Sequence, residues 1–281
     1  MTEPALASSV DRIDTKEDGD DIALSMRDVA FRYPDGTLAV ENVSFSVRRG
    51  SKLGIVGPSG CGKSTLLALI GRFFEPLAGR ITVTQADLKR HPVAMVFQKD
   101  TLLPWLTVND NIRRFYKWNP GRLSRSEVST LVADLVELAG LGGFEKAYPY
   151  QLSGGMRRRV AFLSVVAARP ETLLLDEPFS ALDEPTRVAI HQDAYSIIRD
   201  FRMTTILVTH DLAEAISLCD EILILTARPG TVHERYTIPF GPERDMMELR
   251  QTPEFLEMYG RLWHELSTQI ARSKPEEARR T

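Results

Sequence analysis

Two glycine-rich loops in this chain have the residue types that bind phosphate. The first, GPSGCGKST, occupies residues 57–65 and fits the pattern G-x-x-x-x-G-K-[ST] in full. It stands between a segment typical of a strand, KLGIV, and one typical of a helix, STLLALI. Its glycines let the backbone wrap a phosphate closely, while the amides and the helix N-terminus supply positive potential.

The side chains of this first loop add the chemistry of a nucleoside triphosphate site. Lys63 can reach the β- and γ-phosphates, and the Ser64 hydroxyl can ligate Mg²⁺. Cys61 has two interpretations: it is a small residue that fills space, or a redox-sensitive thiol, since thiols near helix N-termini can have a low pKa. The predicted nucleotide-binding residues of the loop are Gly57, Pro58, Ser59, Gly60, Cys61, Gly62, Lys63, Ser64 and Thr65.

The second loop, LSGGMRRRV, occupies residues 152–160. Ser153 precedes two glycines, Gly154 and Gly155, and three arginines follow soon after. Glycines beside a helix N-terminus indicate backbone amides that point at an anion. Since the first loop can hold most of one triphosphate by itself, the second raises the question of which nucleotide it serves.

Two carboxylates follow a fully apolar segment in LLLDEP. Asp176 and Glu177 stand at its end, and strand ends in open parallel sheets face the ligand crevice. Asp176 suits a Mg²⁺ site, with a water between the carboxylate and the ion. Glu177 is then positioned to orient or deprotonate an attacking water.

His210 and Gln98 end two further apolar segments, ILVTH and VAMVFQ. A single histidine is usually structural, but a place at a strand end, beside Asp211 as the expected N-cap of a helix, favours a functional role. Glutamine orients the nucleophilic water in some GTPases. The alternative for Gln98 is an ordinary polar residue at the end of a strand.

Composition narrows the class of protein. The chain has 281 residues and a formal net charge of −3, which gives no electrostatic argument for binding nucleic acid. Its two cysteines, Cys61 and Cys219, make no disulfide framework, so a reducing compartment is expected. No stretch has the roughly 20 apolar residues of a membrane span. If the protein works at a membrane, another polypeptide must hold it there.

Strand-like and helix-like segments alternate along the chain, which predicts an α/β protein with a parallel-sheet core. The segment of about 100–165 is helical in character, and Ser124 with Glu127 has the spacing of a capping box.

Residues 1–21 are acidic and without periodic apolar positions, so a disordered tail is expected there. Residues 271–281 are expected to form a flexible tail. The predicted strands are 22–33, 43–47, 51–56, 80–83, 93–98, 172–176, 204–210 and 221–225; the predicted helices are 64–74, 124–140, 185–201, 211–219 and 252–271.

Over residues 22–270 the chain resembles the nucleotide-binding subunit of ATP-binding cassette (ABC) transporters. The phosphate loop, LSGGM, LLLDEP, SALD and VTHD occur in that family's order and at similar spacings. The resemblance implies a P-loop NTPase core with a mixed, mostly parallel sheet, an antiparallel β subdomain and a helical insert at about 100–165. It further implies an ATPase that uses ATP and Mg²⁺ and closes as a head-to-tail homodimer around two ATP molecules.

The resemblance also implies roles for residues outside the phosphate loop. Tyr33 would stack on adenine, and Asp183 would cross the dimer interface. His210 would be the switch histidine, and Gln98 would touch Mg²⁺ or water and move with the transport channel. The signature Ser153, Gly154 and Gly155 would bind the γ-phosphate of the ATP held by the partner.

The roles that the resemblance implies, together with the residues identified from the sequence, define an expected catalytic group and an expected Mg²⁺ site. The expected catalytic residues are Glu177, His210 and Gln98. The expected Mg²⁺ site consists of Ser64, Gln98 and, through water, Asp176. Arg158 stands where glutamine is common in the family, and neither the residues nor the resemblance gives it a role.

A narrower resemblance favours an importer. FQKDTLLPWLTVNDNI, LTARPG and EFLEMYGRLWHEL resemble the ATPases of nitrate, sulfonate and taurine importers. This implies a peripheral protein on the cytoplasmic face of the inner membrane, bound to transmembrane permease subunits and served indirectly by an extracytoplasmic substrate-binding protein. The alternatives are an exporter ATPase, a soluble non-transport ABC ATPase and a cassette that binds ATP without hydrolysing it. Intact Lys63, Asp176, Glu177 and His210 argue against the last.

The apolar segment TLLPWLT at 101–107 follows Gln98 and has two interpretations. It is a core turn packed on the helical insert, or it belongs to a groove that receives a permease helix, with Trp105 as the central anchor.

Overall fold

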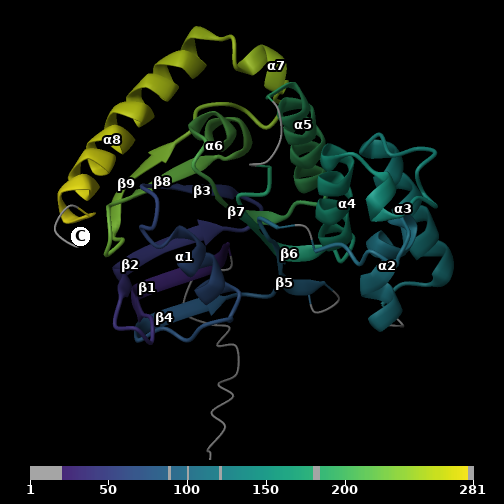
Figure 1. Ribbon diagram of the computed structural model, residues 1–281, viewed down its shortest axis with the longest axis horizontal. Helices are drawn as coiled ribbons and strands as arrows, with labels where there is room; N and C mark the ends of the chain where they lie inside the picture. The colour runs from purple at the N-terminus through teal and green to yellow at the C-terminus, as the bar shows by residue number, and fades with distance from the viewer. Residues whose placement is uncertain (1–20, 88–89, 100, 120–121, 180–183, 278–281) are drawn as a thin grey trace, which may run out of the picture.

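The computed structural model describes residues 21–87, 90–99, 101–119, 122–179 and 184–277. Residues 1–20 of the tail expected at 1–21, and Asp183, therefore lie outside the described residues, whereas Asp21 is described and accepts a hydrogen bond from the backbone N–H of Arg49 at 2.8 Å. A six-stranded sheet runs through the centre of the molecule (Figure 1). Its first five strands are parallel and the sixth is antiparallel to the fifth, which confirms the mixed, mostly parallel sheet. Their order is β5 (His91–Val96), β6 (Pro170–Asp176), β7 (Thr204–Val208), β3 (Lys52–Val56), β8 (Glu221–Leu225) and β9 (Val232–Thr237).

A second, three-stranded antiparallel sheet forms the expected β subdomain. Its order is β2 (Leu38–Arg48), β1 (Ile22–Arg32) and β4 (Ala78–Val83). One apolar cluster joins it to the central sheet and to α1 (Lys63–Ile70), with Val43 of β2, Leu53 of β3 and Leu67 of α1 all fully buried. This shared core fixes the phosphate loop between the two sheets.

Three helices lie together at one end of the molecule, within the segment expected to be helical (Figure 1). They are α2 (Val108–Trp118), α3 (Arg125–Leu138) and α4 (Gly154–Val166), and α2 packs on both α3 and α4. The capping box of Ser124 and Glu127 is present at the start of α3. By the helical period, Leu131, Leu135 and Leu138 share one apolar face of α3. Leu131 and Leu135 are buried, but Leu138, the last residue of the helix, is 53% exposed.

The described chain has four further α-helices, α5 (Glu184–Asp200), α6 (Leu212–Leu218), α7 (Met246–Leu249) and α8 (Pro253–Glu277), and a short 3-10 helix at Pro149–Gln151. The helix α8 runs along the outside of the molecule and packs on α6 and β8 (Figure 1). It continues to Glu277, into the segment where a flexible tail was expected. The helix after the phosphate loop is shorter than predicted: α1 ends at Ile70 rather than at residue 74, because Gly71 caps it and Arg72 has a positive φ of 58°.

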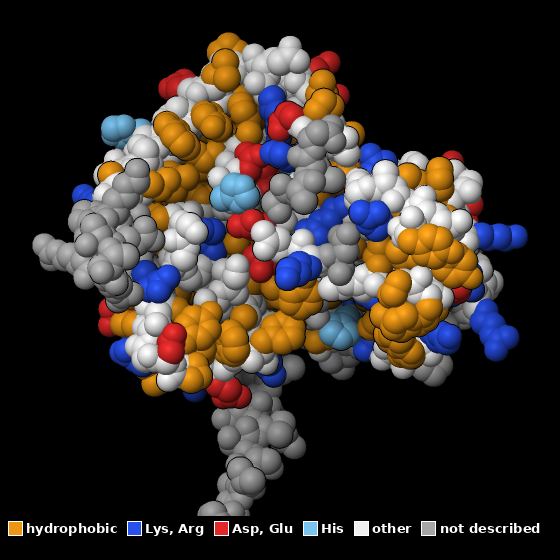
Figure 2. All heavy atoms as spheres, viewed as in Figure 1, with side chains coloured by type: hydrophobic (Ala, Val, Ile, Leu, Met, Phe, Trp, Pro, Cys, Tyr) orange, Lys and Arg blue, Asp and Glu red, His pale blue; other side chains and the backbone are white. Residues whose placement is uncertain are grey.

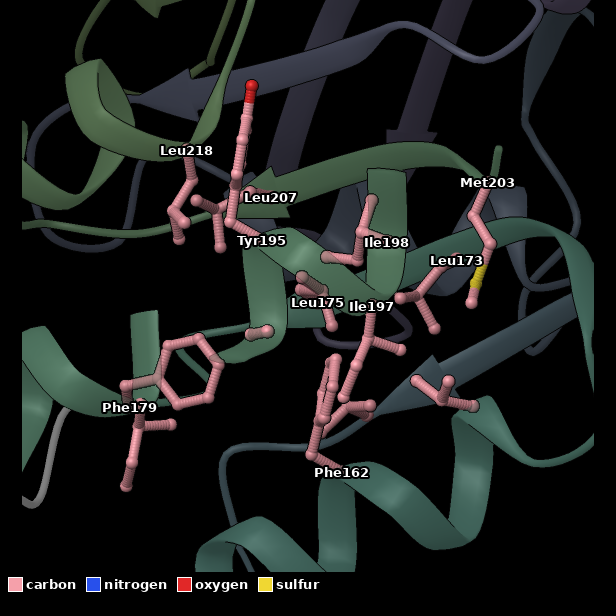
Figure 3. Packing of buried hydrophobic residues seen from close by; sticks show 14 of the residues in the cluster. Phe162, Leu173, Leu175, Phe179, Tyr195, Ile197, Ile198, Met203, Leu207 and Leu218 are labelled. Atoms are coloured by element: carbon pink, nitrogen blue, oxygen red, sulfur yellow. The ribbon is translucent and has the colours of Figure 1, made fainter. Parts of the chain in front are cut away.

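The core between α4, α5 and β6 fixes the second glycine-rich loop relative to the central sheet. Figure 3 shows Phe162 of α4, Ile197 of α5 and Leu175 of β6 in this core. All three side chains are at most 3% exposed. Since close-packed interiors transmit displacements, α4 and the end of β6 are expected to behave as one unit.

Candidate nucleotide site

The first glycine-rich loop joins β3 to α1 at the centre of the molecule. Gly62, just before α1, has a φ of 103°, which favours glycine. A Cβ at this position would lie 2.5 Å from Cγ1 of Val40 and 2.9 Å from the carbonyl oxygen of Ala39. The tight wrap of the loop therefore depends on Gly62 having no side chain.

Lys63 holds its charge inside this loop. Its Nζ donates to the carbonyl oxygens of Gly57, at 2.9 Å, and Pro58, at 3.0 Å. The residue is 8% exposed. A compact ammonium group is thus fixed beside the backbone amides that are expected to meet phosphate oxygens.

Ser64 and Asp176 bring two hard oxygen atoms together. The Ser64 hydroxyl donates to Oδ1 of Asp176 at 2.9 Å, and so joins the start of α1 to the end of β6. Burial raises the pKa of Asp176, and the neighbouring Glu177 raises it further, while Ser64 and Lys63 act in the opposite direction. Oxygen ligands of this kind are those that Mg²⁺ prefers, so the residues fit the ion.

Three strand ends meet at the carboxylate of Glu177. Its Oε2 accepts a hydrogen bond from Nε2 of Gln98 at 3.0 Å, and Nδ1 of His210 lies 3.2 Å from the same oxygen. The three residues follow β5, β6 and β7, which are neighbours in the sheet. The structure thus brings together the three residues predicted to be catalytic, and it gives Gln98 a partner that the sequence did not identify.

A hollow of about 830 Å³ opens beside this cluster. Tyr33 lines it, and its hydroxyl is 2.8 Å from Oγ1 of Thr65. The Tyr33 ring stands edge-on to Phe31 and Phe74, with centroid distances of 5.1 Å and 5.9 Å. In Figure 2, acidic, basic and histidine side chains gather near the middle of the face, between apolar patches. The described lining residues are Tyr33, Asp35, Thr37, Ala39, Ser59, Gly60, Gly62, Lys63, Ser64, Thr65, Glu177, His210 and Arg228.

Arg228 and Asp35 were not identified from the sequence, although both line the hollow. Nε of Arg228 donates to the carbonyl oxygen of Gly60 at 3.1 Å, which connects the segment after β8 to the phosphate loop. Arg228 belongs to the segment LTARPG, whose resemblance to importer ATPases could have indicated that Arg228 has a functional role. The hydrogen bonds of Thr37 lower the pKa of Asp35.

The second glycine-rich loop lies on a different part of the surface. Ser153 is the N-cap of α4, and its Oγ accepts a hydrogen bond from the backbone N–H of Met156 at 3.2 Å. Ser153 and Gly154 are exposed at the start of the helix. Among the described residues that line the hollow, none comes from 152–160. The two phosphate-type loops thus do not share one pocket within the described chain.

Trp105 lies on the surface, 70% exposed. The turn that carries it is fixed from inside by Asn111, which is fully buried. Asn111 accepts from the backbone N–H of Leu103 at 2.9 Å and donates to its carbonyl oxygen at 3.2 Å. Trp105 itself is therefore not packed in a core turn, although Leu102 of the same segment packs against the apolar core and Asn111 of α2 holds the turn on the helical insert.

Cys61 is fully buried in the middle of the phosphate loop, which favours its interpretation as a residue that fills space. Burial raises the pKa of its thiol, although Lys63 opposes this effect. Burial also raises the pKa of Cys219.

We expect both thiols to resist Ellman's reagent in the native protein at pH 8. A raised pKa leaves a smaller thiolate fraction at this pH than a free cysteine has, and the thiolate is the reactive species. Absorbance at 412 nm should show almost no release of thionitrobenzoate until guanidinium unfolds the chain. Fast reaction of Cys61 in the folded protein would instead support a redox role.

Comparisons with known proteins agree with this geometry. A family model described as ABC transporter matches residues 40–180. The chain is 33% identical to the taurine import ATP-binding protein TauB of Jannaschia sp., over 85% of this chain and 94% of that protein. It is 38% identical to the nitrate import ATP-binding protein NrtD of Synechococcus elongatus, over 81% and 85%. A dimeric structure of the ATP-binding cassette MJ0796 with ADP and Pi has a TM-score of 0.66 and 28% identity, over 78% and 100%.

Within the residues described above, no helix has the length and apolar character needed to cross a membrane.

Proposed function

The chain belongs to the ATP-binding proteins of ABC transporters, and from this premise we propose that it drives uptake of a small anion through a separate permease. ATP hydrolysis is the activity of its family. The proposed substrates are nitrate, taurine or another sulfonate, as in the names of the relatives. The observation that carries the proposal is the convergence of Gln98, Glu177 and His210 beside the phosphate loop.

The loop residues would bind the triphosphate. The amides of 57–65 and the ammonium group of Lys63 offer positive charge to the phosphate oxygens. Ser64, Gln98 and, through water, Asp176 would hold Mg²⁺, and the ion would supply positive charge that offsets the negative charge developing during phosphoryl transfer. The Tyr33 ring lines the same hollow and offers a flat surface to the adenine.

Glu177 would orient the attacking water and accept its proton. Its carboxylate is held by Gln98 at 3.0 Å and by His210 at 3.2 Å, so its orientation is fixed before the nucleotide binds. A base held in this way needs little reorganisation when the reaction begins. His210 is 62% exposed at its side chain, which leaves it accessible to the γ-phosphate.

A second copy of the chain would complete each site. Ser153, Gly154 and Gly155 are remote from the lining of the hollow but present a helix N-terminus to the surface. In a head-to-tail homodimer this terminus would meet the γ-phosphate of the ATP bound to the partner, with Asp183 at the same interface. The similar cassette MJ0796 is known in a dimeric structure with ADP and Pi, which supports the proposal that this chain forms a dimer.

The surface around Trp105 would bind the permease at the cytoplasmic face of the membrane. Trp105 is exposed, its turn is fixed by Asn111, and Gln98 precedes this segment and contacts Glu177. A movement of the permease at this surface could thus reach the catalytic carboxylate. The permease would in turn receive the anion from an extracytoplasmic binding protein.

Replacing Trp105 with alanine is expected to uncouple transport while ATP hydrolysis by the isolated subunit stays close to that of the wild type. The exposed ring is not needed for the core, but aromatic anchors at the centre of an interface often contribute 2 kcal/mol or more, roughly 30-fold in affinity. Transport in proteoliposomes and phosphate release by the isolated subunit measure the two effects. Trp118, 63% exposed on α2, offers a matched control. Loss of hydrolysis in the isolated variant would show that Trp105 is needed for folding.

Growth on single nutrients tests the proposed function. A strain that lacks the protein should fail to grow on at least one of three nutrients. These are taurine or an alkanesulfonate as the only source of sulfur, and nitrate as the only source of nitrogen. The wild-type gene should restore growth, and the gene with Glu177→Gln should not. Unchanged growth on all three nutrients, together with increased sensitivity to an exported toxic compound, would favour an exporter ATPase instead.

A further inference from the structure

Arg158 binds the turn that carries the catalytic glutamate. The residue lies in the second turn of α4 and is 6% exposed. Its Nη2 donates to the carbonyl oxygen of Glu177 at 3.2 Å, and its Nε donates to the carbonyl oxygen of Pro178. A planar guanidinium group, which stays charged at all relevant pH values, thus holds two consecutive carbonyl groups in a fixed geometry.

The turn needs such support because Glu177 has an unusual backbone conformation. Its φ is 44°, in the left-handed region that residues with a Cβ adopt at a cost. Its backbone N–H donates to the carbonyl oxygen of Val208 in β7 at 2.9 Å. With Arg158 on its carbonyl oxygen, both backbone groups of Glu177 are fixed, and the direction of its side chain follows from them.

The helix that carries Arg158 begins with the second glycine-rich loop. Ser153 caps α4, Gly154 and Gly155 form its start, and Arg158 follows within two turns. Farther along, Val160 and Phe162 are buried in the core. A displacement of the helix N-terminus is therefore passed directly to the carbonyl groups of Glu177 and Pro178.

We propose that Arg158 is a positioning residue that couples the two ATP sites of the dimer. Contact between Ser153–Gly155 and the ATP of the partner would fix the start of α4, and Arg158 would then fix Glu177 over the ATP of its own chain. Each chain would hydrolyse efficiently only when its signature loop is engaged. This inference rests on the proposed head-to-tail dimer.

The neighbouring arginines bind elsewhere, which makes them useful for comparison. Nη1 of Arg157 donates to the carbonyl oxygen of Leu152 at 2.8 Å. Nη1 of Arg159 donates to the carbonyl oxygen of Ala139 at 2.7 Å, and its Nη2 is 3.4 Å from Asp193. Arg159 joins α4 to the end of α3 and to α5, so its replacement reports on packing rather than on Glu177.

The test compares Arg158→Met with Arg159→Met in the full-length chain. Both changes keep an apolar stem and remove the guanidinium group. For Arg158→Met we expect kcat to fall roughly 10- to 100-fold, as for a misplaced catalytic group, with the Kd for ATP nearly unchanged. The Hill coefficient for ATP should fall towards 1. For Arg159→Met we expect a lower Tm, with kcat and the Hill coefficient near those of the wild type.

Arg158→Gln keeps the test informative if the methionine variant does not fold. Glutamine offers an amide donor on a shorter side chain, and we expect it to fold and to show an intermediate kcat. Wild-type kcat and Hill coefficient in Arg158→Met, or in Arg158→Gln if the methionine variant does not fold, would overturn the inference, and so would equal losses in Arg159→Met. A wild-type protein that stays monomeric with ATP or shows no cooperativity would instead contradict the proposed dimer.

Discussion

Replacing Glu177 with glutamine is expected to abolish ATP turnover while ATP binding is retained. The change is nearly isosteric, and the amide oxygen can still accept a hydrogen bond from Gln98. It removes the group that accepts the proton of the attacking water, an effect of roughly 10²- to 10⁴-fold in rate. It also removes a negative charge near the γ-phosphate, so the ATP-bound dimer should persist. Phosphate release and size-exclusion chromatography with Mg²⁺ and ATP measure the two effects.

Glu257→Gln offers a matched control for this experiment. Glu257 is exposed on α8 and does not line the hollow. The same chemical change at that position should leave turnover and the oligomeric state as in the wild type. Undiminished hydrolysis by Glu177→Gln would show that another group activates the water.

The position of the three catalytic candidates at one edge of the sheet could be predicted from the sequence, but their contact at Glu177 depends on the strand order. Gln98, Glu177 and His210 each come just after an apolar segment with the character of a buried strand. Parallel strands have their carboxyl ends at the same edge of the sheet, so residues distant in the sequence meet there. The strand order β5-β6-β7 then makes these three residues neighbours.

Arg158 and Arg228 could not be assigned from the sequence, because their contacts depend on packing between distant elements. Arg158 reaches Pro178 only because the core around Phe162 holds α4 beside the end of β6. Arg228 reaches Gly60 only because β8 lies beside β3. Long flexible side chains can reach many partners, so their sequence position says little about which one they bind.

The exposure of Leu138 has a similar origin. The helical period predicts which residues share a face, but it does not say where the covering partner ends. Leu131 and Leu135 are covered, whereas Leu138 lies in the last turn of α3 and is largely exposed. Helix ends are thus the positions where burial is hardest to predict from periodicity alone.

Replacing Gly154 with aspartate should leave ATP binding intact and lower hydrolysis roughly 100-fold or more, because the N-terminus of α4 would lose its attraction for the γ-phosphate. The fold should tolerate this change, since a Cβ at Gly154 would meet only Nη2 of Arg157, at 4.0 Å. Aspartate also suits the first turn of a helix. Calorimetry with ATP and phosphate release measure binding and hydrolysis.

Gly154→Ala is the control for added bulk, and we expect a smaller loss of hydrolysis because alanine adds no negative charge. Mixing Gly154→Asp with Lys63→Ala extends the test to the dimer. Neither variant should hydrolyse ATP alone, but a mixed head-to-tail dimer has one site with an intact phosphate loop from one chain and an intact signature loop from the other. Partial return of activity on mixing would therefore be expected only if the two loops act across the interface. Wild-type hydrolysis by Gly154→Asp alone would mean that the second loop does not serve ATP.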